Sequence, residues 1–203
     1  MKKRFLLVFL FIFVIIFVLI FTKNNYKIIQ FGNNKNNKSV KKIEEYILNI
    51  CSYKTTMEVT IKSNKNENKY LIKQDYSKEK SIQIIEEPET IRGVEIIQEG
   101  NKIEVKNSKL NLSQIYNEYP CISENILWLN SFIDLYKNDK DNSKIYEDND
   151  EIIMEINDKN NKYFSNIKLF IDRKSGNPKR MIVQDNNQKN KIYILYKEII
   201  INE

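Results

Sequence analysis

The side chains that most often carry out catalysis are scarce in this chain. Its 203 residues include no histidine, 2 cysteines and 4 glycines. Without histidine the sequence cannot form a Ser-His-Asp or Cys-His nucleophile pair, an HExxH zinc helix or an imidazole acid/base. The glycines are too scattered for a GxGxxG or Walker loop: Gly32, Gly93, Gly100 and Gly176. We therefore expect a protein that is not an enzyme and uses no cofactor.

The two cysteines, Cys51 and Cys121, do not form a CxxC motif. Cys51 follows Ile47 by four residues, which predicts that it lies buried on the apolar face of a helix. A catalytic cysteine would need an activating base, and no histidine can supply one. In an exported domain the two thiols could also pair, and the sequence leaves this alternative open.

An acidic segment near the middle of the chain has the spacing of a calcium-binding loop. Asp139, Asp141, Ser143 and Asp150 fall at positions 1, 3, 5 and 12 of an EF-hand count. Position 6 requires glycine for its sharp turn, but Lys144 stands there. The following residues have the pattern of a strand, so we interpret the segment as a solvated acidic loop without a metal.

Two carboxylate clusters raise the alternative of glycoside hydrolysis. They are Glu86 with Glu87, and Asp148 with Asp150 and Glu151. That reaction needs two carboxyl groups about 5–9 Å apart across a cleft, and spacing in sequence does not establish this. Clustered carboxylates at loop ends are usually solvated, and this is the preferred interpretation.

The charge of the chain is modest for a nucleic-acid-binding protein. It carries 33 basic and 27 acidic side chains, for a net charge of +6. Lys2, Lys3 and Arg4 supply three of these charges, so the rest of the chain has a net charge of +3. Nucleic acid would require a basic stripe with interleaved aromatic residues. We expect no nucleic-acid partner.

The N-terminal segment has the pattern of a membrane anchor. The three basic residues precede an apolar run, Phe5–Phe21, that would span about 25 Å as a helix. A cleaved signal peptide is the main alternative and a buried helix a weaker one, but the small residues of a cleavage site are missing. The sequence therefore predicts a signal anchor at residues 1–22, a polar linker at 23–38 and one domain at 39–203.

The orientation of this anchor follows from its flanking charges and from the size of the domain behind it. The leading basic residues favour a cytoplasmic N-terminus. Lysines also follow the span, so the charge count alone does not decide the orientation. A large domain behind an N-terminal signal normally crosses the membrane, and we therefore expect residues 39–203 outside the cytoplasm.

The remaining chain alternates between helical and strand periodicity. Apolar residues recur at helical spacing in residues 39–51 and 123–136. Alternating segments joined by short polar turns predict antiparallel strands, since sequential hairpins cannot build a parallel sheet. The expected strands are 53–61, 70–76, 82–85, 94–96, 103–105, 110–112, 145, 152–156, 163–171, 181–183 and 192–201.

About eleven strands are too many for a flat open sheet. We therefore predict an α+β fold: a strongly curved antiparallel half-barrel with two helices on its concave side. The 12 tyrosines and Trp128 could line that side and hold an apolar ligand. The preferred interpretation is that the helices fill the concave side and the aromatic residues form the core.

Several segments resemble known proteins. The hairpin from Leu169 to Met181, followed by Gln184-Asp185-Asn186 and a last strand, is similar to the C-terminal hairpin of LolA/LolB-type lipoprotein carriers. The chain more narrowly resembles the germination lipoprotein GerS and its relatives. The segments that carry this likeness are Ser63-Asn64-Lys65, Tyr70-Leu71-Ile72-Lys73-Gln74, Glu87-Pro88, Gly93 and Leu127-Trp128-Leu129-Asn130-Ser131-Phe132-Ile133.

The resemblance implies a non-catalytic, membrane-attached protein in the intermembrane space of the developing spore. Its implied partner is the spore-cortex N-acetylmuramoyl-L-alanine amidase, which allows the cortex to be degraded at germination. The chain departs from the lipoprotein pattern because no lipidated cysteine follows its apolar segment. The alternative function is that of a lipid or lipoprotein carrier or receptor, with an acyl chain in the concave face.

An open sheet has free edges where a partner strand or a second copy can add. We therefore expect the amidase, or a second copy in a homodimer, to dock at an edge strand. From the sequence we take the last strand to be that edge, so that proline at Ile194 would abolish docking.

Overall fold

The computed structural model describes residues 40–63, 65–100, 102–117, 127–157 and 165–202. The anchor and linker predicted at 1–22 and 23–38 lie outside these residues. Within the described part of the chain, no helix combines the length and the apolar character needed to cross a membrane.

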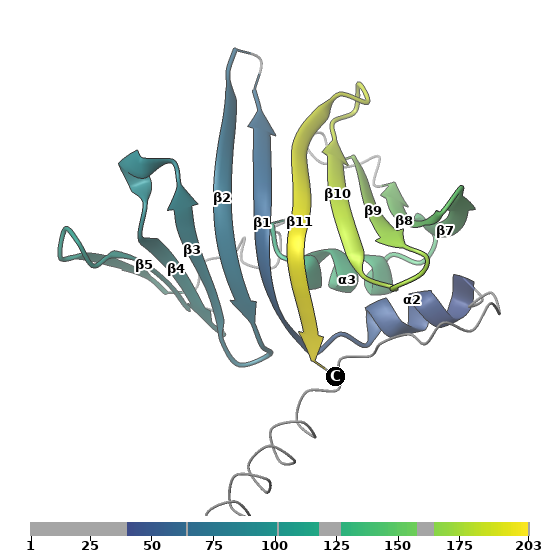
Figure 1. The fold of residues 1–203 in the computed structure, drawn as a ribbon, viewed down its shortest axis with the longest axis horizontal. Helices are drawn as coiled ribbons and strands as arrows, with labels where there is room; N and C mark the ends of the chain where they lie inside the picture. Colours follow the sequence, from purple (N-terminus) through teal and green to yellow (C-terminus); the bar gives the residue numbers. More distant parts are fainter. Residues whose placement is uncertain (1–39, 64, 101, 118–126, 158–164, 203) are drawn as a thin grey trace, which may run out of the picture.

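One antiparallel sheet of eleven strands forms the framework, in the spatial order β6-β5-β4-β3-β2-β1-β11-β10-β9-β8-β7 (Figure 1). Neighbouring strands in each half are also neighbours in sequence, as expected for hairpins. The strands are β1 (Ser52–Lys62), β2 (Glu67–Tyr76), β3 (Ser81–Glu87), β4 (Val94–Glu99), β5 (Lys102–Asn107), β6 (Leu112–Tyr116), β7 (Ser143–Asp148), β8 (Glu151–Asn157), β9 (Asn166–Asp172), β10 (Pro178–Gln184) and β11 (Asn190–Asn202).

Two helices pack on the same side of the curved sheet: α2 (Val40–Leu48) and α3 (Leu129–Asn138) (Figure 1). We call this side the inner face and the opposite side the outer face. A short 3-10 helix, η1 (Glu89–Ile91), joins β3 to β4. The predicted curved antiparallel sheet with two helices on one side is confirmed.

Alternating side chains explain why β1 has one buried face. Tyr53, Met57 and Val59 are at most 1% exposed and point to the inner face, whereas Lys54 and Glu58 are exposed on the outer face. A β-bulge in β11 changes which of its side chains point outward. It is seen in the register, because Thr56 pairs with Glu198 and Met57 with Tyr196. The residue left between them is Lys197. As a result Ile200 lies on the outer face, beside the row that contains Lys54.

The core lies between the helices and the inner face of the sheet. Helix α2 contributes Ile43 and Ile47, and α3 contributes Leu129, Phe132 and Tyr136. These side chains pack against the inner faces of β1, β2 and β8–β11. The partner residues on the strands are Tyr53, Met57, Val59, Ile72, Ile152, Met154, Ile156, Ile167, Leu169, Ile171, Met181, Val183, Ile192, Ile194 and Tyr196.

The aromatic residues of this region are core residues, as the preferred interpretation expected. Tyr53 and Trp128 are 0% and 2% exposed, and Tyr136 and Tyr196 are also buried. Tyr53 stacks on Tyr76 with ring centroids 5.1 Å apart. The side chains of the two helices therefore fill this part of the inner face.

The helix boundaries differ from those predicted. Helix α2 ends at Leu48 rather than near Cys51, and the chain reaches β1 within three residues. Helix α3 begins at Leu129, after Trp128 in extended conformation. The first residues predicted for this helix, 123–126, lie outside the described residues.

The expectation that the last strand is a free edge was wrong. Strand β11 lies between β1 and β10, and Ile194 is 0% exposed. Proline there would remove a backbone donor from a central strand, so that substitution would test folding rather than docking. The two edges of the described sheet are β6 and β7.

Candidate protein-binding surface

The acidic segment with EF-hand spacing forms the end of a helix and the start of a strand. Asn142 Nδ2 donates to both carboxylate oxygens of Asp139 at 3.0 Å, and Ser143 Oγ donates to the Asp139 carbonyl at 2.6 Å. Ser143 begins β7, while Asp141 and Asp150 are exposed. Among the described residues, no three Cys, Asp or Glu side chains are grouped to hold a metal ion.

The two carboxylate clusters do not face each other across a cleft. Glu86 lies on β3 and Glu151 on β8, with five strands between them. Glu86 pairs with Lys73 at 2.8 Å, and hydrogen bonding to this lysine lowers the pKa of Glu86. Arg180 lowers the pKa of Glu151 to about 2. A general acid needs a raised pKa, so these carboxyl groups are suited to ion pairs and not to proton donation.

The prediction that Cys51 is buried on a helix was wrong. Cys51 is exposed and lies in the link between α2 and β1, where its thiol donates to the Asn49 carbonyl at 3.3 Å. It is a free thiol. Its proposed disulfide partner, Cys121, lies outside the described residues.

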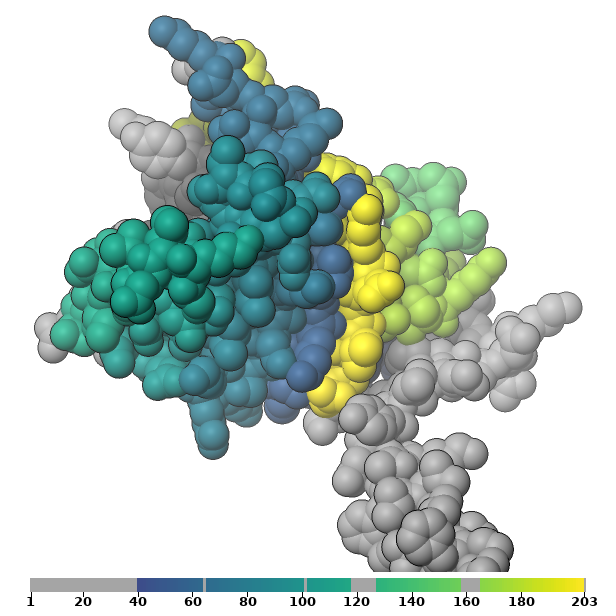
Figure 2. Space-filling model, turned by 60° about the vertical axis from the view of Figure 1, so that its left-hand side comes forward, coloured from purple at the N-terminus to yellow at the C-terminus, as the bar shows by residue number. Residues whose placement is uncertain are grey.

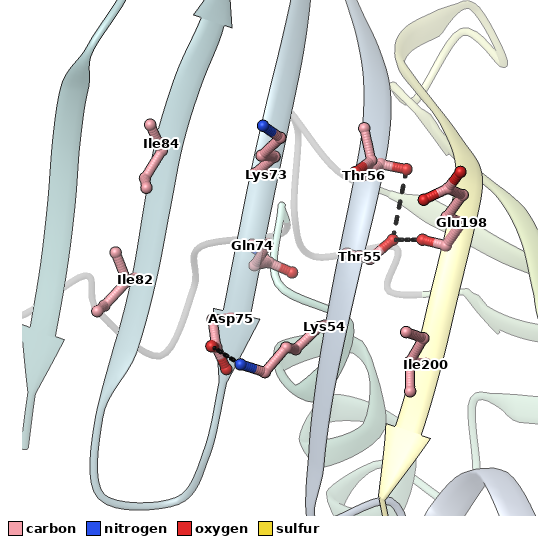
Figure 3. Close-up of a pocket in the computed structure, with 10 residues that line it drawn as sticks. All are labelled: Lys54, Thr55, Thr56, Lys73, Gln74, Asp75, Ile82, Ile84, Glu198 and Ile200. Atoms are coloured by element: carbon pink, nitrogen blue, oxygen red, sulfur yellow. Dashed lines mark hydrogen bonds and ion pairs between the residues drawn. The ribbon is translucent and has the colours of Figure 1, made fainter. Parts of the chain in front are cut away.

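The outer face of the sheet carries a groove of about 320 Å³ across β11, β1, β2 and β3 (Figure 3). The antiparallel register builds it from two rows of side chains. One row consists of Ile200, Lys54, Asp75 and Ile82, and the other of Glu198, Thr56, Lys73 and Ile84. We call this feature the outer groove. Helix α3 lies behind the sheet in this view, so the groove is separate from the core.

Apolar walls and a paired charged floor characterise the outer groove. Ile82 and Ile84 project from β3, and Ile200 of β11, 55% exposed, lies on the opposite side (Figure 3). Between them, Lys54 pairs with Asp75 at 2.7 Å. Because these charges neutralise each other, the groove offers a partner isoleucine side chains beside an exposed ion pair.

The row that contains Ile82 continues across the sheet to its β6 edge. Ile82 pairs with Ile97 of β4, which pairs with Glu104 of β5, which pairs with Ile115 of β6. All five residues of β6 are exposed, and Figure 2 shows the teal end of the sheet reaching the surface. The exposed apolar residues at this edge are Leu110 (65%), Leu112 (62%), Ile115 (45%) and Tyr116 (43%).

A free edge with exposed apolar side chains beside it can accept an extended segment of another protein. The edge strand offers backbone donors and acceptors, and alternate side chains provide contacts on one face. Exposed apolar groups that gather at one edge indicate a contact surface better than isolated ones do. The geometry of this edge suits a contact with another protein.

Sequence reasoning identified the strands here but not the surface. In β3, Ser81 and Gln83 are 5% and 1% exposed on the inner face, while Ile82 and Ile84 face outward. The signal was present, because a strand with polar residues in one register and isoleucines in the other has two chemically distinct faces. Without the fold, the apolar register is naturally assigned to the core.

Comparison with known proteins places the chain in a family. A family model described as a sporulation protein, YdcC-like, matches residues 2–203. No curated protein matches the sequence significantly.

Solved structures share the fold. One is a chain from the structure of the CwlD amidase of Clostridioides difficile in complex with the GerS lipoprotein: TM-score 0.51, 23% identity, with 82% of this chain and 97% of that chain covered. Another is an uncharacterized conserved protein from Thermus thermophilus: TM-score 0.51, 9% identity, with coverage of 82% and 89%. The resemblance seen in the sequence is thus matched in the fold, and with the family model it shows that this chain belongs to the YdcC-like sporulation proteins.

Proposed function

We propose that this chain is a non-catalytic protein of the GerS type that binds and supports a spore-cortex N-acetylmuramoyl-L-alanine amidase. Such support would let the cortex be degraded during germination. Membership in a sporulation family and a shared fold with a structure that contains an amidase–GerS complex support this function.

The observation that carries the proposal is the contrast between the two faces of the sheet. On the inner face, α2 and α3 bury their side chains at the place a carried lipid would need. On the outer face, the groove and the β6 edge leave isoleucine, leucine and tyrosine side chains accessible. A protein partner that covers this row would bury apolar area and pair with the free strand.

The proposal is tested by co-purifying the full chain, in detergent, with the cortex amidase of the same organism. We expect one mixed peak in size exclusion. Ile84→Lys in the outer groove and Ile115→Lys on the β6 edge are each expected to weaken binding at least about tenfold, because an apolar contact becomes a buried charge. Leu135→Lys is the matched control, since Leu135 is also apolar and 37% exposed but lies on α3.

Separate peaks for two folded wild-type proteins would contradict the amidase partnership and favour the carrier alternative, which native mass spectrometry would reveal as retained lipid. Unchanged affinity in both lysine variants would place the contact elsewhere on the molecule. The β6 edge also suits a second copy of this chain. Light scattering without amidase would detect such a homodimer, and Ile115→Lys would be expected to dissociate it.

We also propose that residues 1–22 anchor the protein in a membrane and that the folded domain lies outside the cytoplasm, in the forespore intermembrane space. The apolar run Phe5–Phe21 behind three basic residues supports this placement. A C-terminal epitope tag is expected to be degraded by added protease once the outer forespore membrane has been permeabilised, while the inner membrane is still intact. A tag that survives until the inner membrane is lysed would contradict the placement.

A further inference from the structure

A second cavity lies on the opposite half of the molecule from the outer groove. It has a volume of about 550 Å³ and lies where β8 and β9 meet the end of β10. We call it the polar pocket. Each described residue that lines it is polar or charged, including Glu155, Asn157, Asn166, Lys168 and Gln184. A cavity with this lining suits a hydrophilic ligand rather than an acyl chain or an apolar peptide side chain.

A buried carboxylate organises the wall of the polar pocket. The side chain of Glu155 is 5% exposed and accepts hydrogen bonds from Asn166 Nδ2 at 2.6 Å and Tyr146 Oη at 2.9 Å. Lys144 and Lys168 lie 3.2 and 3.7 Å from its oxygens. Burial by itself would raise the pKa of Glu155, but the hydrogen bonds from Asn166, Tyr146 and Lys144 lower it. The carboxylate is therefore ionised at neutral pH.

The ionised carboxylate fixes the orientation of the Asn166 amide. A carboxylate only accepts hydrogen bonds, so Asn166 must turn its NH₂ group toward Glu155. Its carbonyl oxygen, Oδ1, then points away from Glu155, is buried and has no donor. Buried polar atoms are nearly always paired, which marks this oxygen as a place where a donor is missing. A ligand N–H group in the pocket would supply that donor.

Other groups in the wall complement such a donor. Gln184 Nε2 is held by Asn190 Oδ1 at 2.8 Å and by the Gln188 carbonyl at 3.3 Å, so its amide is fixed in place. Lys168, 29% exposed at its side chain, adds a cation at the rim. Together with Lys144, the lysines exceed the single negative charge of Glu155 by one. The pocket therefore combines one missing donor, two amides held by hydrogen bonds and a small positive excess.

We propose that the polar pocket binds an N-acetylated amino sugar of a peptidoglycan glycan strand. The acetamido N–H would donate to Asn166 Oδ1, and the sugar hydroxyl groups would bond to the surrounding amides. The positive excess suits a neutral or carboxylate-bearing sugar. This inference rests on the proposed function, because an amidase partner acts on the same polymer. The chain would then bind the amidase and also the glycan strand that the amidase acts on.

The test uses the full chain in detergent micelles and isothermal titration with two trisaccharides. Chitotriose carries acetamido groups, and cellotriose has the same linkage but lacks them. We expect saturable binding of chitotriose and at least about tenfold weaker binding of cellotriose, because cellotriose cannot supply the N–H donor. Binding of both sugars with equal affinity, or of neither, would overturn the proposal and leave the pocket as a hydrated cavity.

Variants separate the pocket from general stability. Asn166→Ala and Asn157→Ala are each expected to weaken chitotriose binding about tenfold or more. Asn142→Ala is the matched control, because Asn142 also holds a carboxylate, that of Asp139, but lies outside the pocket. Loss of the Asn166 side chain could release Glu155 and lower the melting temperature. Sugar binding by Asn157→Ala then tests the pocket with the Glu155–Asn166 hydrogen bond intact. Undiminished binding in both pocket variants would overturn the assignment.

The amidase assay distinguishes failure of this inference from failure of the proposed function. Asn157→Ala is expected to co-elute with the amidase as the wild type does, because the polar pocket and the β6 edge lie in different halves of the sheet. Amidase binding without chitotriose binding would overturn only the sugar site. Chitotriose binding without amidase binding would support the sugar site while removing the proposed partner.

Discussion

Replacing Tyr53 with phenylalanine is expected to lower the free energy of unfolding by about 2–4 kcal/mol. The Tyr53 hydroxyl donates to Gln74 Oε1 at 2.7 Å and accepts from the Leu129 backbone N–H at 3.0 Å. Leu129 is the first residue of α3, and Trp128 before it supplies no side-chain cap. The first N–H groups of a helix have no partner within the helix, so Tyr53 serves as the cap. Phenylalanine would leave two buried groups without partners.

Tyr196 provides the matched control for this substitution. It is also a buried tyrosine on the inner face, 6% exposed, but its hydroxyl has no hydrogen-bond partner. Removing that hydroxyl deletes a desolvated polar group, so Tyr196→Phe is expected to change stability by less than about 1 kcal/mol or to increase it. The two variants remove the same atom from the same kind of position.

Urea denaturation, followed by tryptophan fluorescence, measures both variants. Trp128 is the single tryptophan of the chain and lies 6.4 Å from the Tyr76 ring, so it reports on this region directly. Equal stability losses in the two variants would contradict the capping role of Tyr53. A loss confined to Tyr53→Phe would confirm that the hydrogen bonds, rather than the volume of the tyrosine, connect α3 to the sheet.

The strands of this fold could be predicted from the sequence because their polar and apolar residues alternate with the two-residue period of a strand. Tyr53, Met57 and Val59 were assigned to one face of a strand, and that face is buried. The sequential hairpins followed from short polar turns. Periodicity is a local property, and eleven antiparallel strands were therefore predictable one by one.

The spatial order of the strands was harder to predict from the sequence because it depends on one contact between segments that are far apart in the chain. The sheet is continuous only because β1 pairs with β11, through residues such as Val59 and Ile194. No local signal specifies that pairing, so the last strand was taken for an edge. One of the two edges, β6, has the exposed residues Leu112 and Ile115. These residues can be recognised as a contact surface only when it is known that β6 has a single neighbouring strand.

The burial of single residues near the ends of helices and strands was the hardest feature to predict from the sequence. The burial predicted for Cys51 assumed that the helix continues through it, but α2 ends at Leu48 and β1 begins at Ser52. The direction of a side chain in such a link is set by both flanking elements. The polar pocket was missed for a related reason, since Glu155 and Asn166 lie on different strands and meet only through the register of β8 and β9.

Acidification is expected to remove a stabilising ion pair on the outer face of the sheet. Arg180 Nη1 and Nη2 donate to the two carboxylate oxygens of Glu151, each at 2.6 Å, and Lys179 lies 2.9 Å away. The Arg180 guanidinium also lies 3.9 Å from the centroid of the Phe170 ring. This geometry restrains the pair more than a typical surface pair, since bidentate hydrogen bonds and stacking fix the guanidinium plane.

The sign of the pH effect follows from the lowered pKa of Glu151. Its hydrogen bonds to Arg180 bring the pKa to about 2 in the folded protein, from the ordinary value of 4.5. The unfolded chain therefore takes up a proton at this residue before the folded protein does. The stabilisation is fully present above about pH 4.5 and is lost as the pH falls toward 2.

Glu151→Gln is expected to reduce the free energy of unfolding by about 1–2 kcal/mol at pH 7, a value discounted for partial solvent exposure. The difference between wild type and variant should shrink between pH 4.5 and pH 3, because Glu151 takes up a proton in the unfolded wild-type chain while it is still ionised in the folded protein. Urea denaturation at a series of pH values measures this difference. Subtracting the variant removes the contribution of other carboxyl groups with lowered pKa, such as Asp172 and Asp185.

Glu58→Gln is the matched control for this pair. Glu58 also pairs across strands, with Lys197 of β11, but its side chain is 49% exposed, compared with 18% for Glu151. Solvent screening should limit its effect to less than about 1 kcal/mol across the pH range. A pH-independent difference for Glu151→Gln would mean that the glutamine disturbs packing instead of removing a charge. The expected result is a stability difference for Glu151→Gln that decreases as the pH falls, and a difference for Glu58→Gln that does not change with pH. This result would assign the acid sensitivity of this half of the sheet to the Glu151–Arg180 pair.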